Sequence, residues 1–244
     1  IDTLTKTGKP WLLAVGFIKP HLPFTAPQKF LDHYKNVEFP PIPDPNKPTG
    51  PSLWHRSSEF MGNYADKNDP RKDRKYALKV RKHYAASTSY VDDNVGKLLA
   101  YLEKSGATNN TIIILWGDHG FSLGEKSIWG KHHLYHTALH SPLIIKIPNQ
   151  QTTGKPSDAI AETVDIFPTL CELANIPLPN GLEGMSLASV VSDPTTPSDG
   201  AAISFWAGNK SIITRDTHTI FKKEQPFLQF DLTKDPHETN NLIK

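Results

Sequence analysis

The sequence has little cysteine and no long apolar run. Cys171 is the single cysteine among 244 residues, which excludes an internal disulfide and a zinc site built from several thiolates. A membrane-spanning helix needs roughly 20 consecutive apolar residues, and no stretch of this sequence supplies them. We therefore expect a globular chain without a membrane partner.

The chain also lacks a large excess of either charge. It has 27 basic and 25 acidic residues, which gives a formal net charge of +2. This balance argues against nucleic acid as a partner, although it leaves room for a local basic pocket. Hydrophobic residues make up 37% of the sequence, so the chain is long and apolar enough to bury a core in one or two domains.

An initiating methionine is missing too. The first residues, IDTLTKTGKP, are polar and do not have the pattern of a signal peptide. We therefore expect the chain to be a processed or truncated part of a longer protein.

Strand and helix patterns alternate along the first part of the chain. Short apolar runs at 11–17, 111–115 and 141–148 are typical of buried strands. A long amphipathic pattern at 76–104 joins the first two runs, and a shorter helix is expected at 165–174. Strand, helix and strand in this order predict a right-handed βαβ unit, and hence an α/β fold with a mostly parallel sheet flanked by helices.

The last part of the chain changes character. Several short alternating segments follow one another without a helix between them, which predicts a small antiparallel sheet. We therefore predict an α/β core at 1–185 and an antiparallel subdomain at 186–244. Residues 36–75 are rich in proline and show no periodicity, so we expect a surface insertion there.

Residues 116–131, WGDHGFSLGEKSIWGK, carry the first candidate site. The preceding apolar run puts Asp118 and His119 at the end of a strand, where ligands bind in open α/β sheets. A carboxylate beside an imidazole can hold a divalent cation there. Taken alone, the pair is better interpreted as structural, with Asp118 capping a turn and His119 partly buried.

A histidine-rich segment follows. Five of the eleven histidines lie between 119 and 140, but their spacing is not that of a zinc-binding helix. With Lys126 and Lys131, the segment forms either a cationic rim that binds anions or a solvated surface loop. The local pattern leaves both interpretations open.

Further segments accompany the motif GDHGFSLGEKSIWGK at 117–131. In chain order they are PWLLAVGFIKPHLPF at 10–24, HYAASTSYVDDNVGKLLAYLEKSGATNNTIIILWGDHG at 83–120, HSPLIIKIP at 140–148, VDIFPTLCELANIPLP at 164–179, GLEGMSL at 181–187 and FDLTKDPHETNNL at 230–242. Together and in this order, they resemble the sulfatase family of the alkaline phosphatase superfamily, with most similarity to its iduronate-2-sulfatase group, and the motif at 117–131 is similar to the second sulfatase signature. The resemblance implies an alkaline phosphatase-like fold that is incomplete at its N-terminus.

The resemblance also implies a metal and sulfate site. Asp118 and His119 match ligands of the divalent metal, usually Ca²⁺, and Lys131 matches the lysine that contacts the sulfate. A metal and a lysine would stabilise the charge on the sulfate oxygens as the S–O bond breaks. The implied substrate is a sulfated sugar, such as a glycosaminoglycan-like polysaccharide.

Further roles follow from the same resemblance. His21 matches the active-site histidine near the ester oxygen, which can protonate the leaving alcohol. Lys19 is expected to border the sugar, and His140 is expected to support the substrate site. The family habit implies an exported location, which is periplasmic, extracellular or lysosomal.

Part of the expected site is absent from the sequence. Sulfatases use a formylglycine made within a C/S-x-P-S-R motif, and the 244 residues contain no such motif. The paired N-terminal aspartates of the metal site are absent too, and Asp92 and Asp93 do not replace them because they belong to the predicted long helix. We expect the formylglycine in a missing N-terminal part and no turnover by the isolated chain.

Three explanations stay open for this incomplete active site. The chain is the C-terminal portion of a sulfatase, which we favour, or a subunit that completes its site with another polypeptide, or a non-catalytic sulfatase-like binding protein. A different enzyme class, a phosphatase or phosphodiesterase of the same superfamily, is the further alternative.

Overall fold

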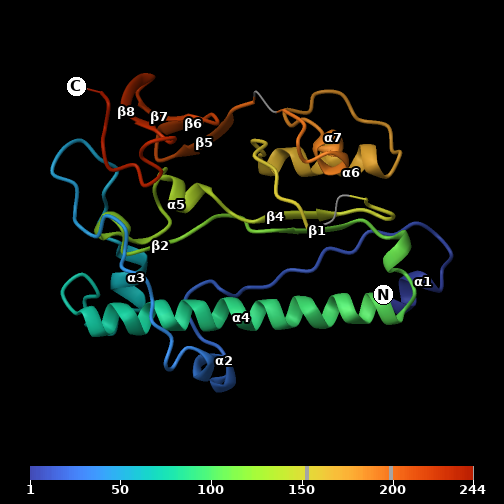
Figure 1. Cartoon of the computed structure of the whole chain (residues 1–244), viewed down its shortest axis with the longest axis horizontal. Helices are drawn as coiled ribbons and strands as arrows, with labels where there is room; N and C mark the ends of the chain where they lie inside the picture. The colour runs from blue at the N-terminus through green and yellow to red at the C-terminus, as the bar shows by residue number, and fades with distance from the viewer. Residues whose placement is uncertain (152–153, 198–199, 244) are drawn as a thin grey trace. The chain divides into compact units, whose positions relative to one another are not determined.

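The computed structural model describes residues 1–151, 154–197 and 200–243. The chain divides into two compact units, each assembled from several segments of the sequence. The first unit comprises residues 1–45, 56–111 and 123–129, and the second comprises residues 46–55, 112–122 and 130–244. Figure 1 shows the elements along the chain, coloured from blue to red.

The first unit is built on one long helix, α4 (Arg74–Lys104). The side chain of Asp73 caps this helix by accepting hydrogen bonds from the backbone N–H groups of Lys75 and Tyr76, at 2.8 and 3.1 Å. The sequence predicted a helix at 76–104, which is confirmed, and the cap starts it two residues earlier. Gly106, at a φ of 77°, follows the end of the helix in the left-handed region that glycine adopts easily.

The shorter elements of the first unit are arranged around this helix. α2 (Gln28–His33) lies against α4 (Figure 1), with the rings of Phe30 and Tyr90 5.4 Å apart. Phe24 meets Tyr84 edge to face at 5.1 Å. The elements are α1 (Asp2–Thr5), α2 (Gln28–His33), α3 (Ser58–Asn63) and 3₁₀ turns at Thr108–Asn110 and Glu125–Ser127.

The apolar run at 11–17 is not a strand, and this prediction was wrong. Its residues are irregular, and Leu12 is 80% exposed. An apolar run becomes a strand only when a neighbouring strand satisfies its backbone, and residues 11–17 have no such partner in the described part of the chain. The βαβ pairing of 11–17 with 111–115 is therefore not formed.

The second unit contains two sheets. β1 (Ile113–Trp116) pairs antiparallel with β4 (Leu143–Lys146), so that Ile113 faces Lys146. The predicted strands at 111–115 and 141–148 are thus confirmed, although they pair with each other in the antiparallel sense. The short strands β2 (Ser122–Leu123) and β3 (Trp129–Gly130), which fall at the segment boundaries of the two units, form a further two-stranded ladder.

The larger sheet of the second unit is the predicted antiparallel one. Its strands lie in sequence order as an antiparallel meander, orange to red in Figure 1. Ile220, Leu228 and Phe230 form its buried face. The strands are β5 (Ala202–Trp206), β6 (Asn209–Ile213), β7 (Thr217–Lys222) and β8 (Gln225–Asp231).

Three helices complete the second unit. α5 (His136–Leu139) and α7 (Ala188–Ser192) are short, and α6 (Ile166–Leu173) confirms the helix expected at 165–174. A 3₁₀ turn, Thr163–Asp165, precedes α6. Among the described residues, no helix combines the length and the apolar character that a membrane crossing requires.

Candidate active site

The loop that follows β1 is held from two sides. On one side, the backbone N–H of Gly117 donates to the carbonyl of Pro142 at 2.9 Å, and the Ser141 hydroxyl donates to the carbonyl of Gly117 at 2.8 Å. On the other side, the N–H of Gly120 donates to the carbonyl of Ala138, in α5, at 2.7 Å. The loop therefore keeps a fixed position between β4 and α5.

Gly120 is required by how closely this loop approaches α5. A Cβ atom at this position would lie 2.2 Å from the carbonyl oxygen of Thr137 and 3.1 Å from that of His140. Real Cβ atoms do not tolerate the first distance, and a backbone carbonyl cannot rotate away as a side chain would. Glycine thus allows the residues just before it to be held directly against α5.

Asp118 and His119 lie side by side at the tip of this loop. The ring nitrogen Nδ1 of His119 is 2.7 Å from the carbonyl oxygen of Gly120, which can only accept, so Nδ1 carries the proton. Its other ring nitrogen, Nε2, lies 3.6 Å from Oδ2 of Asp118, so the two side chains face the same point. The Asp118 side chain is 86% exposed, so its carboxylate is open to a ligand.

This pair fits part of a divalent metal site. The carboxylate suits a hard cation, and a neutral imidazole with a fixed tautomer is a common metal ligand. Six to eight ligands is the usual number around calcium, and a cluster of three or more metal-binding side chains is absent from the described residues. Asp118 and His119 could supply two donors to such a site, and its remaining ligands would have to come from elsewhere.

Lys131 and His140 lie on either side of the histidines at 132, 133 and 136. Lys131 is partly buried, and its carbonyl accepts the N–H of His133 at 2.9 Å. His140 is exposed just after α5, and its ring stacks on that of His136 at 4.7 Å. His132 stacks on Trp206 of β5 at 5.1 Å. Ring contacts therefore order this loop, which is more than a solvated surface loop.

Lys126 does not belong to a cationic rim. Its side chain is only 6% exposed, and its Nζ lies 3.0 Å from Oδ2 of Asp44. The N–H of Lys126 also donates to the carbonyl of Asp44 at 2.6 Å. A buried cation needs such a partner, so this lysine is committed to an ion pair inside the first unit.

Lys19 and His21 lie in the first unit. The ammonium group of Lys19 folds back on its own loop and donates to the carbonyls of Pro23 at 2.5 Å and His21 at 3.2 Å. Nδ1 of His21 lies 2.9 Å from the carbonyl of Leu22, and its Nε2 lies 3.8 Å from Oε1 of Glu59. Because a carbonyl only accepts, Nδ1 is the protonated nitrogen, and the ring is oriented by both contacts.

Two histidines of the second unit have lowered pKa values. Burial lowers the pKa of His136 below its ordinary value of 6.5. The charge of His140 lowers it further, Glu238 opposes the shift, and His218 adds to it. Burial, with a smaller effect of His132, likewise lowers the pKa of His55. The fold therefore favours the neutral form of both rings.

These shifts predict that stability falls as the solution becomes acidic. A lowered folded-state pKa means that the unfolded chain binds more protons below pH 6.5, so the free energy of unfolding rises with pH up to about 6.5 and is level above it. Melting temperatures measured between about pH 5 and 7.5 test this sign. His136→Gln should flatten the dependence, and the exposed surface change His33→Gln should leave it intact.

A family model described as sulfatase matches residues 1–176. The chain belongs to the sulfatase family. This sulfatase chain is 31% identical to a sulfatase of Formosa agariphila. The alignment is 244 positions long and covers 96% of the chain and 46% of the relative. It is 30% identical to an arylsulfatase of Clostridium perfringens, over 97% of the chain and 50% of the relative. It is also 30% identical to iduronate 2-sulfatase of Homo sapiens, over 73% of the chain and 38% of the relative.

The sulfatase chain spans about half the length of the curated relatives it matches.

Solved structures agree on the fold. A phosphonate monoester hydrolase of Silicibacter pomeroyi has a TM-score of 0.80 at 22% identity, over 98% of this chain and 53% of that one. A protein solved with its substrate D-glucosamine-2-N,6-O-disulfate has a TM-score of 0.74 at 24% identity, over 92% of this chain and 59% of that one. The predicted α/β fold of the alkaline phosphatase superfamily is confirmed.

Proposed function

We propose that the protein to which these residues belong hydrolyses sulfate esters on sugars. The observation that carries this proposal is the pair of donors, Asp118 and His119, held at 3.6 Å on a loop fixed between β4 and α5. Membership of the sulfatase family supports it, because the named relatives are sulfuric ester hydrolases. The chemistry needs a cation beside the sulfate, and an open carboxylate next to an imidazole is suited to holding one.

Each residue has a role in this proposal. Asp118 and His119 would hold a divalent metal, which we propose to be calcium, and that ion would supply positive charge beside the sulfate oxygens. Lys131 adds a positive charge to the same sulfate. His21 protonates the departing alcohol, and the Nδ1 contact with its own loop fixes the ring for that transfer. Lys19 and His140 complete the edge of the sugar site.

The nucleophile is proposed to come from outside these 244 residues. The family generally uses formylglycine, and this sequence contains no C/S-x-P-S-R motif. As the finer substrate, we propose a sulfated uronic acid or glucosamine of a glycosaminoglycan-like polysaccharide. The similarity to iduronate 2-sulfatase of Homo sapiens and the sulfated glucosamine bound by a structural neighbour support this class.

The direct test is sulfate release by the complete protein, expressed with and without formylglycine maturation. The substrates are a 2-O-sulfated uronic acid, a 6-O-sulfated glucosamine, an aryl sulfate and a phosphate diester. Matured protein should release sulfate from at least one sugar, whereas the unmatured protein and residues 1–244 alone should release none. Faster phosphate release would favour the phosphodiesterase alternative, and no turnover with retained sugar binding would favour the binding protein.

A further inference from the structure

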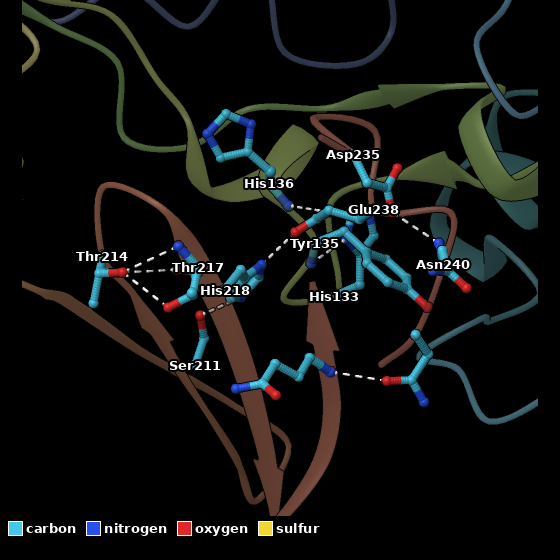
Figure 2. A network of polar contacts seen from close by, with 12 residues as sticks. His133, Tyr135, His136, Ser211, Thr214, Thr217, His218, Asp235, Glu238 and Asn240 are labelled. Carbon is cyan, nitrogen blue, oxygen red and sulfur yellow. Dashed lines mark hydrogen bonds and ion pairs between the residues drawn. The ribbon is translucent and has the colours of Figure 1, made fainter. Parts of the chain in front are cut away.

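Three buried polar side chains join the antiparallel sheet to the tail that follows it. The hydroxyl of Ser211, on β6, lies 2.7 Å from Nε2 of His218, on β7. Nδ1 of His218 in turn forms a hydrogen bond and ion pair with Oε1 of Glu238, beyond β8. Figure 2 shows the three side chains in line, and each is at most 4% exposed.

This serine, histidine and carboxylate have the order of a hydrolytic triad, but they cannot act as one. A nucleophilic serine must reach its substrate, and Ser211 is fully buried. The three residues therefore have a structural role, and the second carboxylate oxygen of Glu238 makes a further contact.

The second oxygen of Glu238 holds the first residue of α5. Its Oε2 accepts the backbone N–H of His136 at 2.9 Å (Figure 2). Two residues later, the carbonyl of Ala138 accepts the N–H of Gly120, which directly follows His119. The Thr137 hydroxyl makes a second link, at 2.7 Å, to the hydroxyl of Ser122. A continuous set of hydrogen bonds thus runs from Glu238 through α5 to the metal-binding loop.

The local backbone confirms that Glu238 is held under constraint. Its φ is 55°, in the left-handed region that a glutamate rarely adopts. Its N–H donates to the carbonyl of Asp235 at 3.0 Å. The Asp235 carboxylate accepts from the Thr239 hydroxyl at 2.9 Å and from the Asn240 N–H at 2.8 Å, which fastens the turn. Such a conformation persists where the surrounding contacts impose it.

We propose that Glu238 is a positioning residue for the Asp118–His119 pair. Its carboxylate fixes the start of α5, and α5 fixes the loop through Gly120 and Ser122. A carboxylate suits this place because it offers one acceptor to His218 and another to His136, and a buried donor without an acceptor is costly. The inference rests on the proposed function only where it predicts a change in calcium affinity. The geometric link can be tested without any turnover.

The test compares Glu238→Ala, Glu238→Gln and a control, Glu224→Ala, in the complete protein. Glu224 lies in the turn before β8 and pairs with Lys210 at 2.7 Å, but its side chain is 77% exposed. Hydrogen exchange is measured by mass spectrometry on peptides covering 118–122, 136–140 and α6. Calcium affinity is measured by calorimetry with calcium chloride alone.

In Glu238→Ala, exchange should speed up about tenfold or more at both 136–140 and 118–122, because a hydrogen bond to a charged group is lost. Exchange in α6 should stay unchanged, which separates this effect from general loosening. The calcium dissociation constant should rise about 10- to 100-fold, as for partners that orient metal ligands. Glu238→Gln keeps an acceptor for His136 and should show a smaller change, and Glu224→Ala should show none.

Unchanged exchange at 118–122 in a folded Glu238→Ala protein would overturn the inference, even if 136–140 changed. If Glu238→Ala does not fold, hydrogen exchange of the same peptides in Glu238→Gln decides the question. If Glu238→Gln also fails to fold, Glu238 has a general structural role and the inference is overturned. If the unsubstituted protein binds no calcium, the proposed metal site fails, while hydrogen exchange still decides on the positioning role.

Discussion

Asp118→Asn is expected to remove the bound metal and to lower sulfate release by the complete protein about 100- to 1000-fold, the range for losing one electrostatic stabiliser. The Asp118 carboxylate is open to solvent, and its Oδ1 accepts the N–H of His119 at 3.1 Å. An asparagine oxygen can keep that hydrogen bond, so the turn should persist while the negative charge is lost. The substitution therefore tests the ligand charge and leaves the loop in place.

Metal content by elemental analysis and initial rates of sulfate release are the measurements. The matched control is Asp93→Asn, on the exposed face of α4. There the carboxylate pairs with Lys97 at 2.6 Å, and this hydrogen bond lowers the pKa of Asp93. Asp93→Asn should keep both metal and activity. Full metal occupancy in Asp118→Asn would remove this residue from the ligand set.

Trp129→Ala is expected to destabilise the protein by about 3–5 kcal/mol, the usual cost of deleting a large buried aromatic side chain. Trp129 is almost completely buried, and its ring lies 6.0 Å from that of Phe60. Its backbone N–H donates to the buried hydroxyl of Ser57 at 2.9 Å. Gly124 also makes room for the indole, because a Cβ atom there would lie 3.1 Å from the Trp129 ring.

Urea unfolding of the complete protein gives the change in the free energy of unfolding for this variant. Trp129→Phe keeps an aromatic ring against Phe60 and should cost clearly less than the alanine substitution. Equal stability of Trp129→Ala and the unsubstituted protein would show that this ring does not belong to a core that folds cooperatively.

The sequence was most informative where a local pattern is long or where motifs keep their order. α4 was predicted because apolar residues recur on one helical face, whereas its cap at Asp73 was found only in the structure. The run at 11–17 misled us because apolar composition does not reveal whether a neighbouring strand is present. Its exposed Leu12 shows that this run lacks the cover of a buried strand.

The residues around the candidate site were harder to predict. Lys126 looked like a surface cation, but Asp44, 82 positions away, makes it a buried ion pair. His218 and Glu238 belong to no catalytic or metal-binding sequence pattern. The contact between His218 and Glu238 joins residues 20 positions apart, and the contact between His136 and Glu238 joins residues 102 positions apart. The one available signal was the tail segment FDLTKDPHETNNL, which matched the family without suggesting what Glu238 contacts.

The sequence by itself determined the family, the long helix α4, the two strand segments that became β1 and β4, and the position of an acid and an imidazole at a strand end. These features are local, because hydrophobic periodicity and short motifs depend on neighbouring residues. Only the tertiary structure decided which strand β1 pairs with, which lysine is buried, and which tail residue accepts the hydrogen bond from the start of α5. Those outcomes depend on burial and on hydrogen bonds between distant segments, which no local pattern encodes.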